Sequence, residues 1–243
     1  MPSDKLLRLL GKRIYRTAAL AVGMLLVVVT LGAVALLGWR AYEDTLREDR
    51  ANGELQARVL EDHATRSFET VSVALTYLSN ELARDDIPAS SVRVGTLLSQ
   101  ALVGLPYVRE IGVLDASGYV LASSSGADIG LRIATMGRLG VMPASGQEKL
   151  GSFEFGRSLA ALAVGASPDR ASLRLGFIPV TRVFATKAGK SFLLVALVNP
   201  DFFSTFQLLT LNNAKNTAYL LGYQGHVLAS SGPAVGAKNR VLC

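Results

Sequence analysis

The hydrophobic residues of the chain first gather in one uninterrupted run near the N-terminus. Residues 17–39 contain no charged side chain and are bounded by Arg16 and Arg40. At about 1.5 Å per residue, a helix of this length crosses a hydrocarbon core of roughly 30 Å. The run therefore predicts a transmembrane helix.

Charges on either side of the run predict its orientation. Residues 1–16 carry a net charge of +4, whereas four acidic residues lie within positions 43–49. Because basic residues favour the cytoplasmic side, residues 1–16 are predicted to be a cytoplasmic tail and the later residues to lie outside. A cleaved signal peptide is the alternative, since residues 33–35 read Ala-Val-Ala, but the run exceeds the about 7–15 residues of a signal core.

After the run, apolar residues recur at intervals of three or four up to about Ala83, with no proline. This spacing is typical of a helix with one buried face. Gly53 interrupts the pattern where it is weakest, so residues 40–86 are predicted to form a charged stalk followed by a packed helix. The sequence Asp85-Asp86-Ile87-Pro88 ends it. The apolar positions are Leu60, Ala64, Phe68, Val71, Leu75, Leu78 and Leu82.

A second helix is predicted at Ser90–Val103, after which the pattern changes to short β-branched runs separated by glycine. Such runs predict strands of an antiparallel sheet. Turns at residues 115–118 and 187–190 would join the strands in pairs, and a short helix is predicted at Ile129–Leu139. The predicted strands are Val108–Leu114, Tyr119–Ser123, Ser172–Val183 and Phe192–Val198.

One segment of the sequence occurs twice. Residues 113–124 read VLDASGYVLASS and residues 220–231 read LLGYQGHVLASS, so that Gly118 matches Gly225 and the string VLASS recurs. Each copy also follows a predicted helix, the second of which spans about residues 200–213. The repeat predicts two tandem units of one α+β architecture.

These motifs resemble a known family of receptor domains. The succession of membrane helix, long exported helix, "LDASGYVLASS" hairpin, "FLLVALVNPDFF" strand and "GYQGHVLASS" hairpin resembles the double-Cache, tandem PAS-like, sensor region of bacterial membrane receptors. Residues 57–75, "ARVLEDHATRSFETVSVAL", look like the opening helix of such regions in diguanylate cyclases and sensor histidine kinases.

The resemblance implies a ligand-sensing input region in a bacterial inner membrane, with the sensor on the periplasmic or extracellular side. Residues 87–199 would be a membrane-distal Cache domain, and residues 200–243 a linking helix with an incomplete membrane-proximal unit. The implied partners are a small-molecule ligand of unknown class, the lipid bilayer and often a second copy of the chain. A cyclic-di-GMP or phosphorelay output would lie beyond residue 243. A stand-alone tethered binding or scaffold protein is the alternative.

By the same resemblance, a ligand pocket is expected between the sheet and its loops. An arginine there would grip a carboxylate with two hydrogen bonds. The expected ligand-binding residues are Tyr107, Arg109, Tyr119, Phe153, Phe155, Arg157, Arg174 and Asp201.

No catalytic, metal or cofactor site is predicted. His63 is interpreted as a solvated helix position and His226 as a strand surface residue. The sequence Gly189-Lys190-Ser191 resembles the end of a phosphate-binding loop, but the first glycine of that motif is missing, because position 184 is Phe184. The chain has one cysteine, Cys243, which excludes a disulfide within it. An exported enzyme is therefore disfavoured.

Composition fits a membrane-anchored protein better than one that binds nucleic acid. Half of the residues are hydrophobic and only 18% are charged, which is too apolar for a single soluble globule. The net charge of +6 is divided into +4 in residues 1–16, −5 in residues 40–86 and +7 in residues 87–243, with the basic residues dispersed. No nucleic-acid partner is expected.

Overall fold

The computed structural model describes residues 3–84, 92–134, 139, 144–165, 175–211 and 216–232, with side chains from Leu20 onward. The chain divides into two compact units, Met1–Leu55 and Gln56–Cys243. The first unit, where described, is helical throughout, and the second combines helices with antiparallel sheets. The fold class is α+β, as the sequence predicts.

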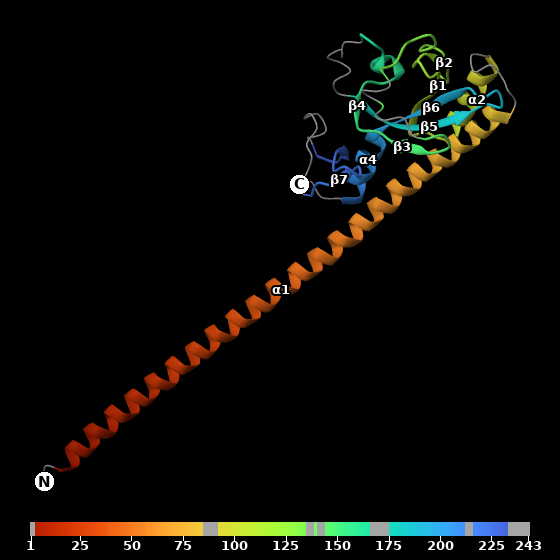
Figure 1. Ribbon diagram of the computed structural model, residues 1–243. Helices are drawn as coiled ribbons and strands as arrows, with labels where there is room; N and C mark the ends of the chain where they lie inside the picture. Colours follow the sequence, from red (N-terminus) through yellow and green to blue (C-terminus); the bar gives the residue numbers. More distant parts are fainter. Residues whose placement is uncertain are drawn as a thin grey trace. The chain divides into compact units, whose positions relative to one another are not determined.

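Helix α1 is continuous from Ser3 to Arg84 (Figure 1). The interruption predicted at Gly53 is therefore wrong. A helical glycine costs roughly 1 kcal/mol relative to alanine, a penalty that the good helix formers around Gly53 offset. By length and composition, the apolar part of α1 is able to cross a membrane, and its hydrophobic side chains between Leu20 and Trp39 are exposed.

A six-stranded antiparallel sheet forms the centre of the second unit. Its order is β2-β1-β6-β5-β3, and β4 pairs with β5 beside β3. The predicted hairpins join β1 to β2 and β5 to β6, and β1 lies against β6 in the middle of the sheet. The strands are β1 (Val108–Leu114), β2 (Val120–Ser123), β3 (Glu148–Leu150), β4 (Glu154–Phe155), β5 (Gly176–Ala185) and β6 (Ser191–Val198).

The short helix predicted at Ile129–Leu139 is wrong over its described part. Residues 132 and 133 instead make isolated β-bridges, to Tyr119 and Ala163. Backbone hydrogen bonds to residues 118–120 hold this segment in an extended conformation instead of a helix. Val120 N donates to Leu131 O at 2.9 Å, and Ile133 N donates to Gly118 O at 2.8 Å. A 3₁₀ helix, η1 (Leu159–Leu162), occurs later, and the Ser158 hydroxyl caps its N-terminus.

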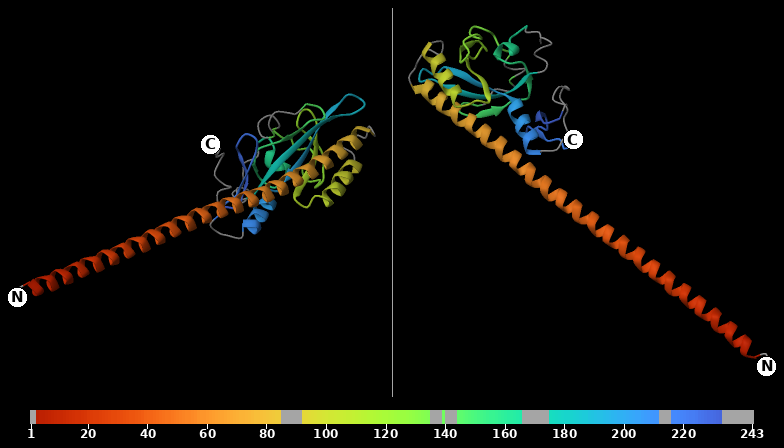
Figure 2. Two further views of the ribbon diagram at one scale, coloured as in Figure 1. Left: turned by 90° about the horizontal axis from the view of Figure 1, so that it is seen from below. Right: turned by 180° about the vertical axis from the view of Figure 1, so that it is seen from behind.

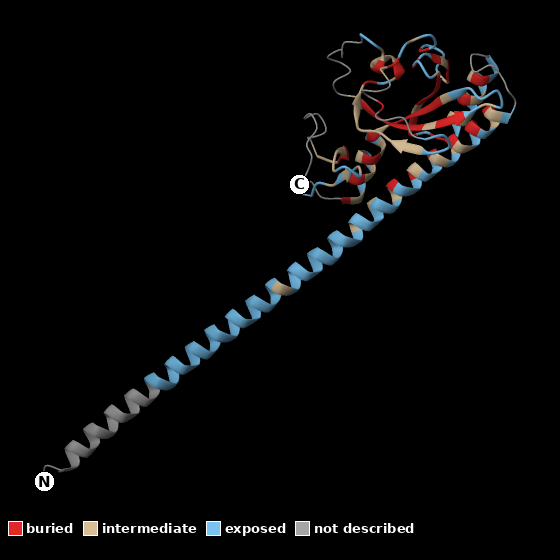
Figure 3. Ribbon diagram, in the orientation of Figure 1, coloured by how far each residue is buried: buried red, intermediate tan, exposed pale blue. Residues whose placement is uncertain are grey.

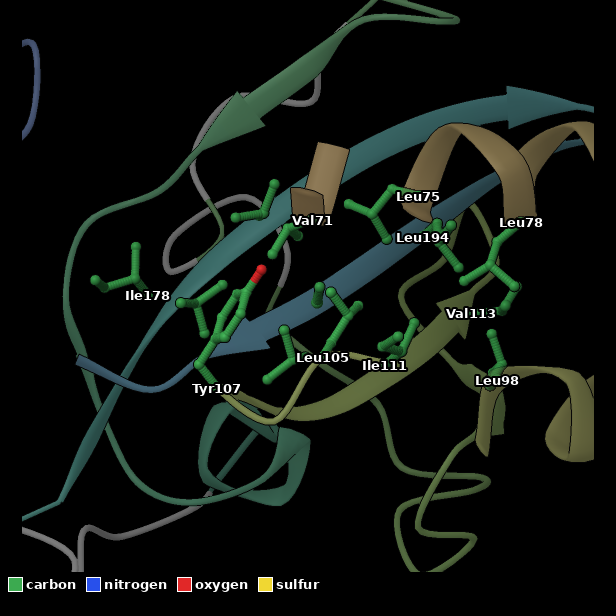
Figure 4. Packing of buried hydrophobic residues seen from close by; sticks show 14 of the residues in the cluster. Val71, Leu75, Leu78, Leu98, Leu105, Tyr107, Ile111, Val113, Ile178 and Leu194 are labelled. Carbon is green, nitrogen blue, oxygen red and sulfur yellow. The ribbon is translucent and has the colours of Figure 1, made fainter. Parts of the chain in front are cut away.

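Helices cover one face of the sheet. Residues 64–82 of α1 lie along it, and α2 (Val92–Val103) packs beside the C-terminal turns of α1 (Figures 1 and 2). Figure 3 shows that burial on α1 is confined to this part. Figure 4 shows the resulting core, to which α1 contributes Val71, Leu75 and Leu78, α2 contributes Leu98, β1 contributes Ile111 and Val113, and β5 and β6 contribute Ile178 and Leu194.

The opposite face of the sheet is covered by η1 and neighbouring loops. Leu159 and Leu162 are fully buried there with Phe177 of β5. Gly112 of β1 makes room for η1, because a Cβ at this position would lie 2.5 Å from the Leu159 side chain. The sheet is therefore buried on both faces by different elements.

The sequence repeat is also a structural repeat. Strands β7 (Tyr219–Leu221) and β8 (Val227–Ser230) pair in the register of β1 and β2 shifted by 107 positions, including the bulge. Gly118 and Gly225 both have positive φ, 85° and 76°. Helix α4 (Pro200–Leu211) precedes the second hairpin, as predicted, and Leu228 and Ala229 join the core that contains Phe203.

Truncation of a buried α1 side chain tests the packing of this helix on the sheet. Leu75 is fully buried, so Leu75→Ala is expected to lower the free energy of unfolding of the second unit by about 2–5 kcal/mol. Val73 is 68% exposed on the same helix, and Val73→Ala is expected to change the free energy of unfolding by no more than about 0.5 kcal/mol. Urea unfolding of the detergent-solubilised chain, followed by near-ultraviolet circular dichroism, measures both. Equal effects would contradict the described packing.

Candidate functional site

Arg109 near the start of β1 is held by two residues that follow β6. Its Nη2 donates to Asn199 Oδ1 at 2.6 Å and to Asp201 Oδ2 at 3.1 Å. Only 15% of the side chain is exposed, and Nη1 is buried with no hydrogen-bond partner in the described part of the chain. Burial lowers the pKa of Arg109; Asp201 opposes this effect and the nearby Arg157 adds to it. The positive charge of Arg157 is thus added near the ion pair of Arg109 and Asp201.

Tyr107 lies next to Arg109 but belongs to the core. Its hydroxyl donates to the Ser67 carbonyl of α1 at 3.1 Å, and its ring stacks on Phe202 of α4 with centroids 4.8 Å apart. The Asn199 amide donates to the Tyr107 carbonyl at 2.8 Å. Tyr107 thereby joins β1 to both helices beside the Arg109 site.

His63 of α1 differs from the solvated position that its sequence context predicts. It is half-buried, and its ring stacks on Phe206 of α4 with centroids 3.6 Å apart and planes 9° from parallel. Burial lowers its pKa. The aromatic residues of α4 that cover it are distant in sequence, which is why the local pattern did not reveal the contact. His226 is also half-buried rather than a surface residue.

The other predicted ligand-binding residues fall into separate groups. Phe153 and Phe155 pack edge to face with centroids 5.2 Å apart. Arg157 is exposed and close enough to Arg109 to affect its pKa. Tyr119 lies at the far end of β1, 42% exposed, with the Arg132 guanidinium 5.7 Å from its ring centroid. Arg174 lies outside the described residues.

A buried polar group that sequence reasoning missed lies on the η1 face of the sheet. Glu110 of β1 accepts hydrogen bonds from the hydroxyls of Ser123 and Ser125 and from the Leu159 amide. Asp128 lies beside it and accepts from the Ala160 amide at 3.3 Å. The available signal was one acidic residue among the apolar residues of Val108–Leu114.

No metal cluster marks a further site among the described residues. No three histidine, cysteine, aspartate or glutamate residues gather there in an arrangement that would hold a metal ion. A groove of about 370 Å³ lies between α1 and α2, lined by apolar Leu82, Val94 and Leu97 and by polar side chains that include Glu81 and Arg93.

No protein-family model matches the sequence, and no curated protein matches it either. Solved structures do match. The extracellular domain of the candidate histidine kinase rpHK1S-Z16 is similar at 20% identity with a TM-score of 0.54, covering 74% of this chain and 68% of that one. An extracellular ligand binding receptor from Desulfohalobium retbaense is similar at 14% identity with a TM-score of 0.56, and the match covers 74% of this chain but only 31% of the receptor chain.

The ligand-binding domain of the Pseudomonas fluorescens chemoreceptor CtaA, solved with L-isoleucine, is similar at 14% identity with a TM-score of 0.50, covering 81% of this chain and 74% of that one. At these identities the likeness concerns the fold. The chain has the same fold as these extracellular sensor and ligand-binding domains, in agreement with the resemblance noted in its sequence.

Proposed function

We propose that the chain is the membrane-anchored, extracytoplasmic sensing region of a bacterial signalling receptor. The observation that carries the proposal is the continuity of α1, since one helix contains both the apolar segment and the residues that pack on the sensor sheet. A change in the packing of residues 64–82 is thereby connected through the backbone to the segment predicted to span the membrane. The fold, shared with extracellular sensor domains, supports the same function.

The Arg109 site is the favoured place for a small anionic ligand, such as the carboxylate of an amino acid. Arg157 adds a second positive charge near Arg109, whose ion-pair partner is Asp201, and among the described residues the buried Nη1 of Arg109 has no hydrogen-bond acceptor. A carboxylate would satisfy this donor and reduce the repulsion between the guanidinium groups. The fold relationship to a domain solved with L-isoleucine supports an amino-acid probe.

Signalling requires that the ligand bind two arrangements of the helices with different affinity. The Arg109 site adjoins both helices that would move, because Asp201 belongs to α4 and Tyr107 contacts α1 and α4. Ligand binding would then change the packing of α1 and, through its backbone, act on a cytoplasmic output. That output would be a histidine kinase phosphorelay or a cyclic-di-GMP enzyme.

Membrane orientation is testable with single cysteines in a Cys243→Ser background. Lys187→Cys lies in the exposed turn between β5 and β6 and is expected to react with a membrane-impermeant maleimide in spheroplasts. Ser3→Cys is expected to react only after the membrane is permeabilised, because the basic tail faces the cytoplasm. The reverse pattern would contradict the proposed orientation, and labelling of both positions in intact spheroplasts would exclude a membrane anchor.

Ligand binding is testable by the thermal stability of the detergent-solubilised chain in the presence of single L-amino acids. A ligand at a hundredfold excess over its dissociation constant stabilises the native state by about 2.7 kcal/mol. Arg157→Gln is expected to weaken binding roughly tenfold or more without unfolding the protein, because Arg157 is exposed.

The matched control is Arg66→Gln, an exposed arginine that pairs with Asp62 on α1. It is expected to leave binding unchanged. If no amino acid stabilises the chain, the assignment of this ligand class fails. If Arg157→Gln binds a stabilising amino acid as tightly as the unmodified chain does, the ligand occupies another place.

A further inference from the structure

Two buried carboxyl groups meet on the face of the sheet opposite α1. Glu110 of β1 is 2% exposed and Asp128, in the turn after β2, is 4% exposed. Each is hydrogen-bonded to the first turn of η1, since Leu159 N donates to Glu110 Oε2 at 2.9 Å and Ala160 N donates to Asp128 Oδ2 at 3.3 Å. The pair therefore holds η1 to the sheet.

The second oxygen of Glu110 fixes the pair to β2 and the residues after it. Ser123 Oγ and Ser125 Oγ both donate to Glu110 Oε1, the latter at 3.1 Å. The carboxyl groups of Glu110 and Asp128 accept from the consecutive amides of Leu159 and Ala160, which brings them close together, and Asp128 raises the pKa of Glu110. Two carboxylates in such contact repel strongly, whereas one proton between them replaces the repulsion with a hydrogen bond.

Among the residues that the structure describes, the charged groups on the surrounding elements do not supply a counter-ion. Arg109 of β1 is turned to Asn199 and Asp201, and Arg132 lies over the Tyr119 ring. Strands β2 and β6 and helix η1 contain no titratable side chain, and Arg157 before η1 is exposed. Burial raises the pKa of Glu110, and the neighbouring Asp128 raises this pKa further. The hydrogen bonds from Ser123 and Leu159 oppose the rise.

The internal repeat shows that the hairpin does not require the acid. In the first copy Ile111 N donates to Ser124 Oγ, and at the matching place in the second copy Ala218 N donates to Ser231 Oγ. The position that matches Glu110 is Thr217, yet the register and the bulge are the same. Glu110 is therefore an addition to the first hairpin, placed where η1 must be held.

We propose that Glu110 and Asp128 share one proton and form a pH-sensitive clasp that holds η1 on the sheet and releases it when the proton is lost. The clasp goes beyond the proposed ligand site, because it needs neither Arg109 nor a bound molecule. In an extracytoplasmic domain it would make the pH of the surroundings a second input.

The direction of the effect follows from the raised pKa of Glu110. The group favours its protonated form in the folded state, so its stabilising contribution is complete below the ordinary pKa of 4.5 and is lost as the pH rises through the raised pKa. A rise in pH should therefore open η1, and a fall in pH should close it.

Hydrogen exchange of the detergent-solubilised full chain tests the clasp, with protection factors corrected for the intrinsic pH dependence of exchange. Protection of the Leu159 and Ala160 amides is expected to fall about tenfold or more as the pH rises through the raised pKa of Glu110. The amide of Ala218 provides an internal control, because it makes the hairpin hydrogen bond of the second copy, in which Thr217 occupies the position that matches Glu110. Equal pH dependence at Leu159 and Ala218 would overturn the proposal.

Asp128→Asn imitates the protonated pair. The asparagine Nδ2 donates to Glu110, and its Oδ1 still accepts from Ala160, so this variant is expected to keep η1 protected at all pH values tested. Glu69→Gln, at an exposed position of α1, is the matched control and is expected to keep the pH dependence of the unmodified chain. A full pH dependence in Asp128→Asn would exclude the shared proton.

Infrared difference spectroscopy of the unmodified chain gives a readout that does not rely on any variant. The stretching band of a protonated, buried carboxyl group is expected to disappear over the same pH range in which the Leu159 amide loses protection. If no such band exists above the ordinary pKa of glutamate, the pair holds no proton and the proposal is wrong.

Discussion

The packing of one apolar stripe of α1 on the central sheet is the constraint on which the second unit depends. Ala64, Val71, Leu75, Leu78 and Leu82 recur at helical spacing and are buried against strands that would otherwise expose a hydrophobic face. Each buried leucine or valine contributes about 1.5–3 kcal/mol. Polar contacts fix the register of the helix on the sheet edge, because Arg182 of β5 binds both Ser79 of α1 and Glu148 of β3. The helix proposed to anchor the chain is thus also part of the core of the second unit.

The two faces of the sheet are suited to different tasks. The face toward α1 is closed by aliphatic side chains, whereas the opposite face holds η1 through the buried pair of Glu110 and Asp128. Apolar packing changes little with pH, but a buried carboxyl pair has two protonation states with different energies. The Arg109 site lies where the end of β6 leads into α4, so a ligand there and a proton at the clasp would act on separate parts of the same sheet. Ligand binding and protonation, the two proposed inputs, would both reach α1 through the strands of the sheet.

Local pattern predicted most of the fold, because helix periodicity, glycine turns and the repeated VLASS string are properties of neighbouring residues. The strands Val108–Leu114 and Phe192–Val198 and the helix that begins at Pro200 agree closely with the structure. Long-range contacts explain the differences. The Ile129–Leu139 prediction failed because hydrogen bonds to Gly118 and Val120 extend this segment, and β3 and β4 are too short to produce a pattern.

The candidate site was predictable only in part for the same reason. Arg109 and Asp201 were selected and do meet, but Glu110 and Asp128 are 18 positions apart in sequence and are joined only by the folded chain.

The central claim is that residues 64–82 of α1 unfold together with the sheet as one cooperative unit. Native-state hydrogen exchange of the detergent-solubilised chain tests it directly, because amides of one cooperative unit share one free energy of opening. The account predicts that the amides of Val71, Leu75 and Leu78 open with the same free energy as those of Leu194 and Val195 in β6. Opening of the α1 amides at a free energy several kcal/mol lower would show that the helix is not part of the cooperative unit of the sheet, and would contradict its proposed role as the connection between sensor and membrane.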